Sequence, residues 1–228
     1  MKAFLLALQF LTCLPVSLKA APGPADWGRS ALAYPLVGLL IGLLLAALLT
    51  ATWALITGGL HLDGLADSAD AWVGGHGDRE RTMTIMKDPR SGPAAVSTLA
   101  LVLLLKFVAL VALAKAGAWP ALLLAPVLGR SALVALLLST PYVRPGGMGS
   151  AMSAHLPRAA AVLALLLAAA GALVAGKIGA LALAVAVVAW LGLRWMMVRR
   201  LGGMTGDTLG AAVELTEVAV LVALALSL

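Results

Sequence analysis

Three aspartates, Asp63, Asp67 and Asp70, stand in a segment whose other residues are mostly apolar or small. On a helix, their spacing of four and then three residues places them within about 60° of one another. Carboxylates on so narrow a stripe repel each other unless a cation binds them, and Mg²⁺ is a hard ion that prefers such oxygen ligands. The spacing therefore predicts a metal site. The alternative is a solvated charged face, but such a face normally mixes both signs of charge.

Two residues beside the stripe could support this chemistry. Gly64 would let a phosphate group or a second helix approach the backbone. His61 would lie about 160° away from the stripe if the helix extends that far. For His61, a supporting or capping role is as open as catalysis.

The connector after this helix carries basic residues. Gly74 to Gly77 should end the helix, and Asp78 is typical of the N-cap of a short helix. Lys87, Asp88 and Arg90 then lie in a turn, where cations could bind a diphosphate beside the metal site. A basic loop that only sets membrane topology is the alternative.

A second acidic segment enters the last apolar stretch. Asp207 is a candidate N-cap, and Glu214 follows on the same face, roughly 10 Å along a helix; Glu217 lies deeper. Ionisable groups within membrane spans are costly and usually face a polar interior. We therefore expect this helix to stand beside the Asp63 helix and to contribute to the metal or hydroxyl-binding site.

Two cations fall inside apolar stretches. Arg130 is mid-span, and its best partner would be a carboxylate or a phosphate group. Lys106 could pair with an acid, but the sequence offers no candidate, so it stays outside the predicted site.

The composition predicts the kind of helices that position these residues. The chain has 228 residues, of which 62% are hydrophobic and 11% charged, whereas soluble domains are about a quarter charged. Stretches of about 20 apolar residues are long enough to span a bilayer. They predict an all-α, polytopic transmembrane bundle of about six or seven spans, forming one catalytic domain over residues 1–228. The candidate spans are 31–57, 94–114, 119–139, 159–176, 178–198 and 211–228, with 3–18 as a shorter seventh.

The charge distribution predicts the orientation. The net charge is +6, but the basic residues lie between spans rather than on one face, so nucleic acid is not the expected partner. Lys and Arg gather beside the three long connectors, which places those connectors in the cytoplasm. Nearly all acidic residues lie there too, although carboxylates contribute little to topology. We expect the N-terminal stretch to be a retained membrane segment, with a cleaved signal as the alternative.

Four segments resemble the cobalamin synthase family, the adenosylcobinamide-GDP ribazoletransferases. They are Phe10–Pro15, Gly59–Asp70, Ile85–Gly92 and Gly202–Gly210 with the glutamates that follow. The resemblance implies that a hydroxyl of α-ribazole, or of its 5′-phosphate, attacks the cobinamide-linked phosphorus of adenosylcobinamide-GDP and releases GMP. It also implies Mg²⁺ as cofactor, a corrinoid nucleotide as substrate and the bacterial inner membrane as the location.

On this basis the predicted site has three parts. Asp63, Asp67 and Asp70 hold Mg²⁺, and either Asp70 or Glu214 takes the hydroxyl proton. The substrate diphosphate is bound by Lys87, Arg90 and Arg130. The supporting residues are His61, Gly64, Asp88, Asp207 and Glu217.

Other functions stay open at this point. A prenyltransferase would use an Asp-rich motif on a lipid diphosphate, and a CDP-alcohol phosphotransferase would release CMP by a similar displacement. A divalent-cation transporter would also need buried acids. A homo-oligomer is compatible with the sequence.

Overall fold

The computed structural model describes residues 2–11, 15–18, 20–22, 26, 30, 47–145 and 148–228. The chain forms two compact units, Met1–Leu49 and Thr50–Leu228. The first contains helix α1 (Lys2–Leu11) and an ion pair between Lys2 and Asp26 at 2.7 Å. The second unit carries the predicted site.

The described residues are almost entirely helical, which confirms the predicted all-α fold. After an apolar helix at Ala47–Ile56, the second unit contains α4 (Leu60–Gly74), α5 (Arg79–Ile85), α6 (Pro93–Lys115), α7 (Pro120–Ser139), α8 (Met148–Ala154), α9 (Arg158–Val174), α10 (Gly176–Leu201) and α11 (Gly206–Leu226). Within the described ranges the only strand-like pairing is one isolated bridge between Tyr142 and Met204.

Four helices, α6, α7, α10 and α11, are long and apolar enough to cross a membrane. They match four predicted spans, although α11 begins at Gly206 rather than near 211. Helix α9 is apolar but has 17 residues. Much of the predicted span 31–57, and part of 3–18, lies outside the described residues. A multi-pass bundle is therefore confirmed, while the total of six or seven spans stays a prediction.

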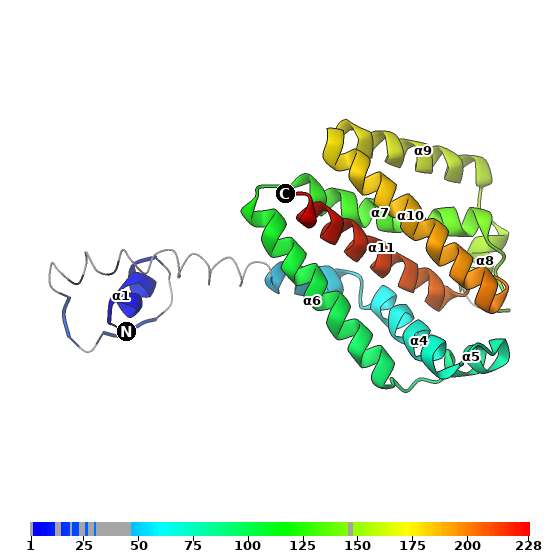
Figure 1. Cartoon of the computed structure of the whole chain (residues 1–228), viewed down its shortest axis with the longest axis horizontal. Helices are drawn as coiled ribbons and strands as arrows, with labels where there is room; N and C mark the ends of the chain where they lie inside the picture. Colours follow the sequence, from blue (N-terminus) through cyan, green and yellow to red (C-terminus); the bar gives the residue numbers. More distant parts are fainter. Residues whose placement is uncertain are drawn as a thin grey trace. The chain divides into compact units, whose positions relative to one another are not determined.

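Helix α11 is the centre of this bundle and packs against α4, α6, α7 and α10 (Figure 1). Its Val213, Val220 and Leu221 are fully buried. The outer helices instead expose large apolar side chains, among them Leu104 of α6, Leu166 of α9 and Val188 of α10. A bundle that is apolar outside as well as inside suits a hydrocarbon surrounding.

The three long connectors meet at one end of the bundle. Val143 N donates to Met204 O (2.9 Å), and Met204 N donates to Pro141 O (2.8 Å), so the segments after α7 and α10 are joined. Arg200 at the end of α10 donates to Thr82 Oγ1 in α5 and to the carbonyl oxygen of Trp72 in α4, both at 3.1 Å. The predicted gathering of these connectors is therefore present in the fold.

Candidate active site

Helix α4 carries all three aspartates of the predicted stripe. It starts after Gly59, which has a φ of +70°, and ends at Gly74, as the glycine cluster predicted. Its buried side is made of Gly64, Leu65, Ala66, Ser68 and Ala71. Small residues on that side let α4 lie close to its neighbours while the aspartates occupy another face.

Close contact between α4 and α11 brings the two acidic segments together. A Cβ added at Gly64 would lie 2.7 Å from the carbonyl oxygen of Asp207, and one at Gly210 would lie 3.3 Å from His61 Cα. Gly64 therefore has no room for a side chain, and at Gly210 a side chain would make a tight contact with the backbone of α4. The expected pairing of these helices is confirmed.

Asp207 does not cap α11, contrary to the prediction. The N-cap is Thr205, whose hydroxyl accepts from Thr208 N at 3.2 Å, and Thr208 Oγ1 accepts in turn from Thr205 N at 2.9 Å. This reciprocal capping box satisfies the helix start. Asp207 is thus free to bind elsewhere, and it pairs with Arg144 at 2.6 Å.

A pocket of about 720 Å³, which we call the acidic pocket after its two aspartates, opens beside this contact. Asp63 and Asp207 line it on the acidic side, and Lys87 and Arg144 bring positive charge. Its size falls within the roughly 300–1,000 Å³ of small-molecule sites. A pocket with carboxylates and cations together can hold both a metal ion and a phosphate group.

The carboxylates here repel one another. Burial, followed by the charges of Asp63 and Asp207, raises the pKa of Asp67 to about 6. Arg144 opposes this rise, and Asp70 adds a smaller increase. Three neighbouring carboxylates that share one arginine are a donor set that fits a hard divalent cation. No cluster of three or more possible metal ligands is preformed among the described residues, but Mg²⁺ commonly uses one or two carboxylates and takes its other oxygens from substrate phosphates and water.

Asp70 has a different environment from the other two. Its two carboxylate oxygens accept from Gly92 N at 2.5 Å and from Ala95 N at 2.9 Å. These amides belong to the N-terminus of α6, whose N-cap, Gly92, has no side chain to cap it. Asp70 therefore caps α6 from α4 and does not line the pocket. This position argues against the predicted roles of metal ligand and base.

The predicted diphosphate-binding cations are not all in one place. Lys87 lines the pocket. Arg90 pairs with Asp88 at 2.7 Å in the turn, with 86% of the arginine side chain exposed, and neither residue lines the pocket. That pairing lowers the pKa of Asp88 to about 2. The carboxylate thus offsets much of the charge that Arg90 would offer a phosphate.

Arg130 belongs to a buried ionic network rather than to the pocket lining. Lys106 Nζ lies 2.7 Å from Glu214 and 2.6 Å from Glu217, and Arg130 pairs with the other oxygen of Glu217. Both glutamates are almost fully buried. The network supplies the partner that the sequence could not offer for Lys106, and it joins α6, α7 and α11. Glu214 is thereby directed toward Lys106, which argues against its predicted role as proton acceptor.

His61 connects this network to the pocket. Its Nδ1 lies 3.5 Å from Arg130 Nη2, and the residue lines the pocket. Burial, and then the charge of Arg130, lower the pKa of the imidazole below its ordinary 6.5. A neutral ring that accepts at Nδ1 carries its proton on Nε2, so His61 can donate a hydrogen bond there.

Sequence reasoning missed Arg144 as a site residue. The residue lies in the connector after α7, and its contact with Asp207 depends on the pairing of that connector with residues 202–205. One signal was available, because Arg144 is on the same face as the other long connectors. Its partner could not be chosen from several acids without the fold.

The fold and the site together define a multi-pass membrane protein with a pocket at one end of its spans that is lined by both carboxylates and cations. The sequence pattern of the cobalamin-5-phosphate synthase family matches residues 3–225, and the chain belongs to that family. A protein of Pseudomonas putida (strain GB-1), named adenosylcobinamide-GDP ribazoletransferase, is 59% identical over the full length of both chains.

Two further relatives carry the same name. The protein of Pseudomonas fluorescens (strain SBW25) is 56% identical over 99% of this chain and 100% of its own length. The protein of Stutzerimonas stutzeri (strain A1501) is 56% identical over 99% of this chain and 98% of its own length. No solved structure matches the chain.

Proposed function

We propose that this protein joins adenosylcobinamide-GDP to α-ribazole or its 5′-phosphate, the last assembly step of cobalamin biosynthesis. The ribose hydroxyl oxygen forms a bond to the cobinamide-linked phosphorus, and the bond from that phosphorus to the oxygen of GMP breaks. Adenosylcobalamin, or its 5′-phosphate, and GMP result. The observation that carries the proposal is family membership over nearly the whole chain, with relatives of this name at 56–59% identity.

The pocket residues suit a diphosphate. Lys87 and Arg144 can balance the charge on its oxygens, and the planar guanidinium of Arg144 can bind two oxygens at once. Arg144 would then divide its hydrogen bonds between Asp207 and the substrate. We assign it the cationic role that Arg90 and Arg130 were predicted to fill, because Arg144 lines the pocket and those two arginines do not.

Asp63, which lines the pocket, and Asp67, which does not line it but feels the charges of Asp63, Asp207 and Arg144, would hold Mg²⁺. When bound, the ion would withdraw charge from the phosphoryl oxygens and from the leaving phosphate of GMP. Asp63 and Asp207 are the carboxylates that line the pocket, so one of them accepts the hydroxyl proton. The neutral His61 donates a hydrogen bond and does not act as the base.

The pocket would face the cytoplasm of a bacterial inner membrane. The connectors at its end of the bundle carry most of the basic residues, and such residues favour the cytoplasmic side. That side is also where soluble nucleotide substrates would reach the pocket.

The test follows GMP release by purified protein in lipid, with adenosylcobinamide-GDP and α-ribazole, with and without Mg²⁺. We expect turnover that requires Mg²⁺ and falls at least about 100-fold in Asp63→Asn, as when a transition-state electrostatic contact is lost. Glu80→Gln, which changes an exposed acid of α5 outside the pocket, is the matched control and should retain activity.

The products also separate the alternatives. A prenyltransferase would release pyrophosphate and a CDP-alcohol enzyme CMP, whereas a transporter would move metal without nucleotide turnover. Near-wild-type GMP release by Asp63→Asn would contradict the metal role while leaving the reaction in place.

A further inference from the structure

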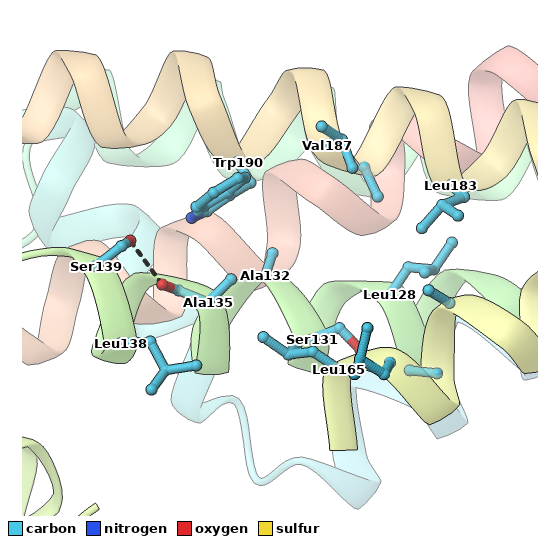
Figure 2. Close-up of a pocket in the computed structure, with 14 residues that line it drawn as sticks. Leu128, Ser131, Ala132, Ala135, Leu138, Ser139, Leu165, Leu183, Val187 and Trp190 are labelled. Carbon is cyan, nitrogen blue, oxygen red and sulfur yellow. Dashed lines mark hydrogen bonds between the residues drawn. The ribbon is translucent and has the colours of Figure 1, made fainter. Parts of the chain in front are cut away.

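A second cavity differs from the acidic pocket in the chemistry of its lining. It is a groove of about 420 Å³ between α7, α9 and α10, and its lining is almost wholly apolar. Figure 2 shows Leu128, Leu165 and Leu183 toward one end and Trp190 and Ser139 toward the other. None of its residues lines the acidic pocket, so the reaction proposed above does not use it.

The groove exists because small side chains face one another across three helices. Its lining includes Ala132 and Ala135 of α7 and Ala168 and Ala169 of α9. Along its length, α9 fully buries only Ala161 and Ala172. Because the outer faces of α9 and α10 are covered with exposed Leu and Val, hydrocarbon surrounds this groove in a membrane, and an acyl chain can enter it.

Positive charge gathers at the Ser139 end of the groove. Arg158 Nη2 donates to Leu138 O at 2.8 Å, and Arg194 donates to Ser139 O from Nε at 3.1 Å and from Nη2 at 3.0 Å. Leu138 and Ser139 both line the groove. Within the described part of the chain, neither arginine has a carboxylate within ion-pair distance, unlike Arg90, Arg130 and Arg144.

Polar donors remain available at this end. Each guanidinium has five N–H groups, and the carbonyl contacts of α7 use one in Arg158 and two in Arg194. The indole Nε1 of Trp190 is buried without a hydrogen-bond partner. It lies one helical turn before Arg194 on α10. An apolar groove that ends at two uncompensated arginines and an unused indole N–H matches an acyl chain joined to a phosphate.

We propose that this groove binds an anionic phospholipid, with one acyl chain between α7, α9 and α10 and its phosphate against Arg158 and Arg194. Basic pockets between membrane helices are the usual sites for such headgroups. Since the connector that carries Arg144 begins directly after α7, the lipid would hold the end of α7 that leads into the acidic pocket.

Native mass spectrometry of the protein in detergent tests the proposal, with phosphatidylglycerol and phosphatidylcholine as the added lipids. We expect retention of phosphatidylglycerol to exceed that of phosphatidylcholine by on the order of tenfold, given two basic contacts. The double variant Arg158→Gln, Arg194→Gln should lose this preference, whereas the double Lys variant should keep most of it. Arg199→Gln, which removes an exposed charge of α10 outside the groove, is the matched control and should keep it fully.

Filling the groove gives an independent measurement. Ala168→Phe should reduce retention of phosphatidylglycerol, whereas Leu163→Phe, on an exposed position of the same helix, should not. Equal retention of both lipids by the wild type would overturn the proposal. So would a photo-crosslinker at Ala169 that joined a second copy, or residues 1–49, instead of lipid. If the Gln double variant retained phosphatidylglycerol as the wild type does, the two arginines would only cap α7, and this result would also contradict the proposal.

Discussion

The three aspartates on one face of α4 have different roles because their surroundings differ. Asp63 lines the acidic pocket, while burial, and then the neighbouring like charges, raise the pKa of Asp67 to about 6. Asp70 binds two backbone amides of α6. What decides each role is which groups lie within hydrogen-bonding distance, and spacing along the helix does not specify that.

Asp67 should make the protein sensitive to pH when divalent ions are removed. Its pKa is higher in the folded state than the ordinary 3.8, so between about pH 4 and 6 the folded state binds more protons than the unfolded state. Stability without metal should therefore fall as pH rises through this window. Thermal unfolding in a chelator should show this fall in the wild type and less of it in Asp67→Asn.

The same variant should respond differently to Mg²⁺. If Asp67 helps to hold the ion, the wild type should be stabilised by added Mg²⁺ at pH 8 and Asp67→Asn should be stabilised much less. An equal Mg²⁺ shift in both proteins would count against Asp67 as a ligand.

Asp70→Asn separates a capping role from a catalytic one. Asn keeps one of the two acceptor oxygens, so we expect a loss of about 1 kcal/mol or less in stability and most of the activity retained. Asp70→Ala should cost about 1–2 kcal/mol because both amides lose their acceptor. Denaturation and GMP release are measured on both variants, and a 100-fold loss of turnover in a stable Asp70→Asn protein would restore the catalytic assignment.

At the scale of helices, α11 determines how the bundle is held together. It contributes Glu214 and Glu217 to the ionic network with α6 and α7, and it meets α4 through Gly64 and Gly210. Buried charges are tolerated when each has a partner, and removing one partner leaves another charge unsatisfied in a medium of low polarity.

The ionic network predicts a particular pattern of stability. Lys106→Met should destabilise the protein by about 3–5 kcal/mol, because Glu214 loses its cation and Glu217 loses one of two. Adding Glu214→Gln should recover a large part of that loss. Unfolding in detergent measures the coupling, and additive effects of the two substitutions would show that the pair does not interact.

At the scale of the whole molecule, the bundle has long polar connectors at one end and short connections at the other. The connectors around α5, α8 and the start of α11 are joined by hydrogen bonds and surround the acidic pocket, whereas α6 and α7, and α9 and α10, are linked by short turns at the other end (Figure 1). This separation is what an enzyme needs if it is held in lipid but takes its substrates from water.

Cysteine labelling can test the orientation. In a Cys13→Ser background, which removes the one native cysteine, His76→Cys should react with a membrane-impermeant reagent only from the cytoplasmic side. Lys177→Cys, in the first turn of α10 beside its short connection to α9, should react only from the opposite side. The reverse pattern would place the pocket outside the cytoplasm and contradict the proposed location.

The sequence by itself determined the membrane bundle, the helix that carries the three aspartates and the N-cap at Asp78, whose side chain accepts from Arg81 N at 2.6 Å. It also predicted the pairing of the two acidic segments. The first three follow from local rules, since apolar length, helical period and cap residues act over a few neighbouring residues. The pairing was expected for another reason, because glutamates within a span need a polar interior to face. The predicted start of α11 was wrong because the N-cap is Thr205, two residues before the predicted cap Asp207.

Only the tertiary structure decided the partners of the charges. Arg144 is bound to Asp207, Lys106 to two glutamates, Arg130 to Glu217, and Asp70 to amides of another helix. Each of these contacts joins residues distant in the sequence, and several acids could have served each cation equally well by type. The choice depends on distances of a few ångström, which the packing of α4, α6 and α7 around α11 fixes.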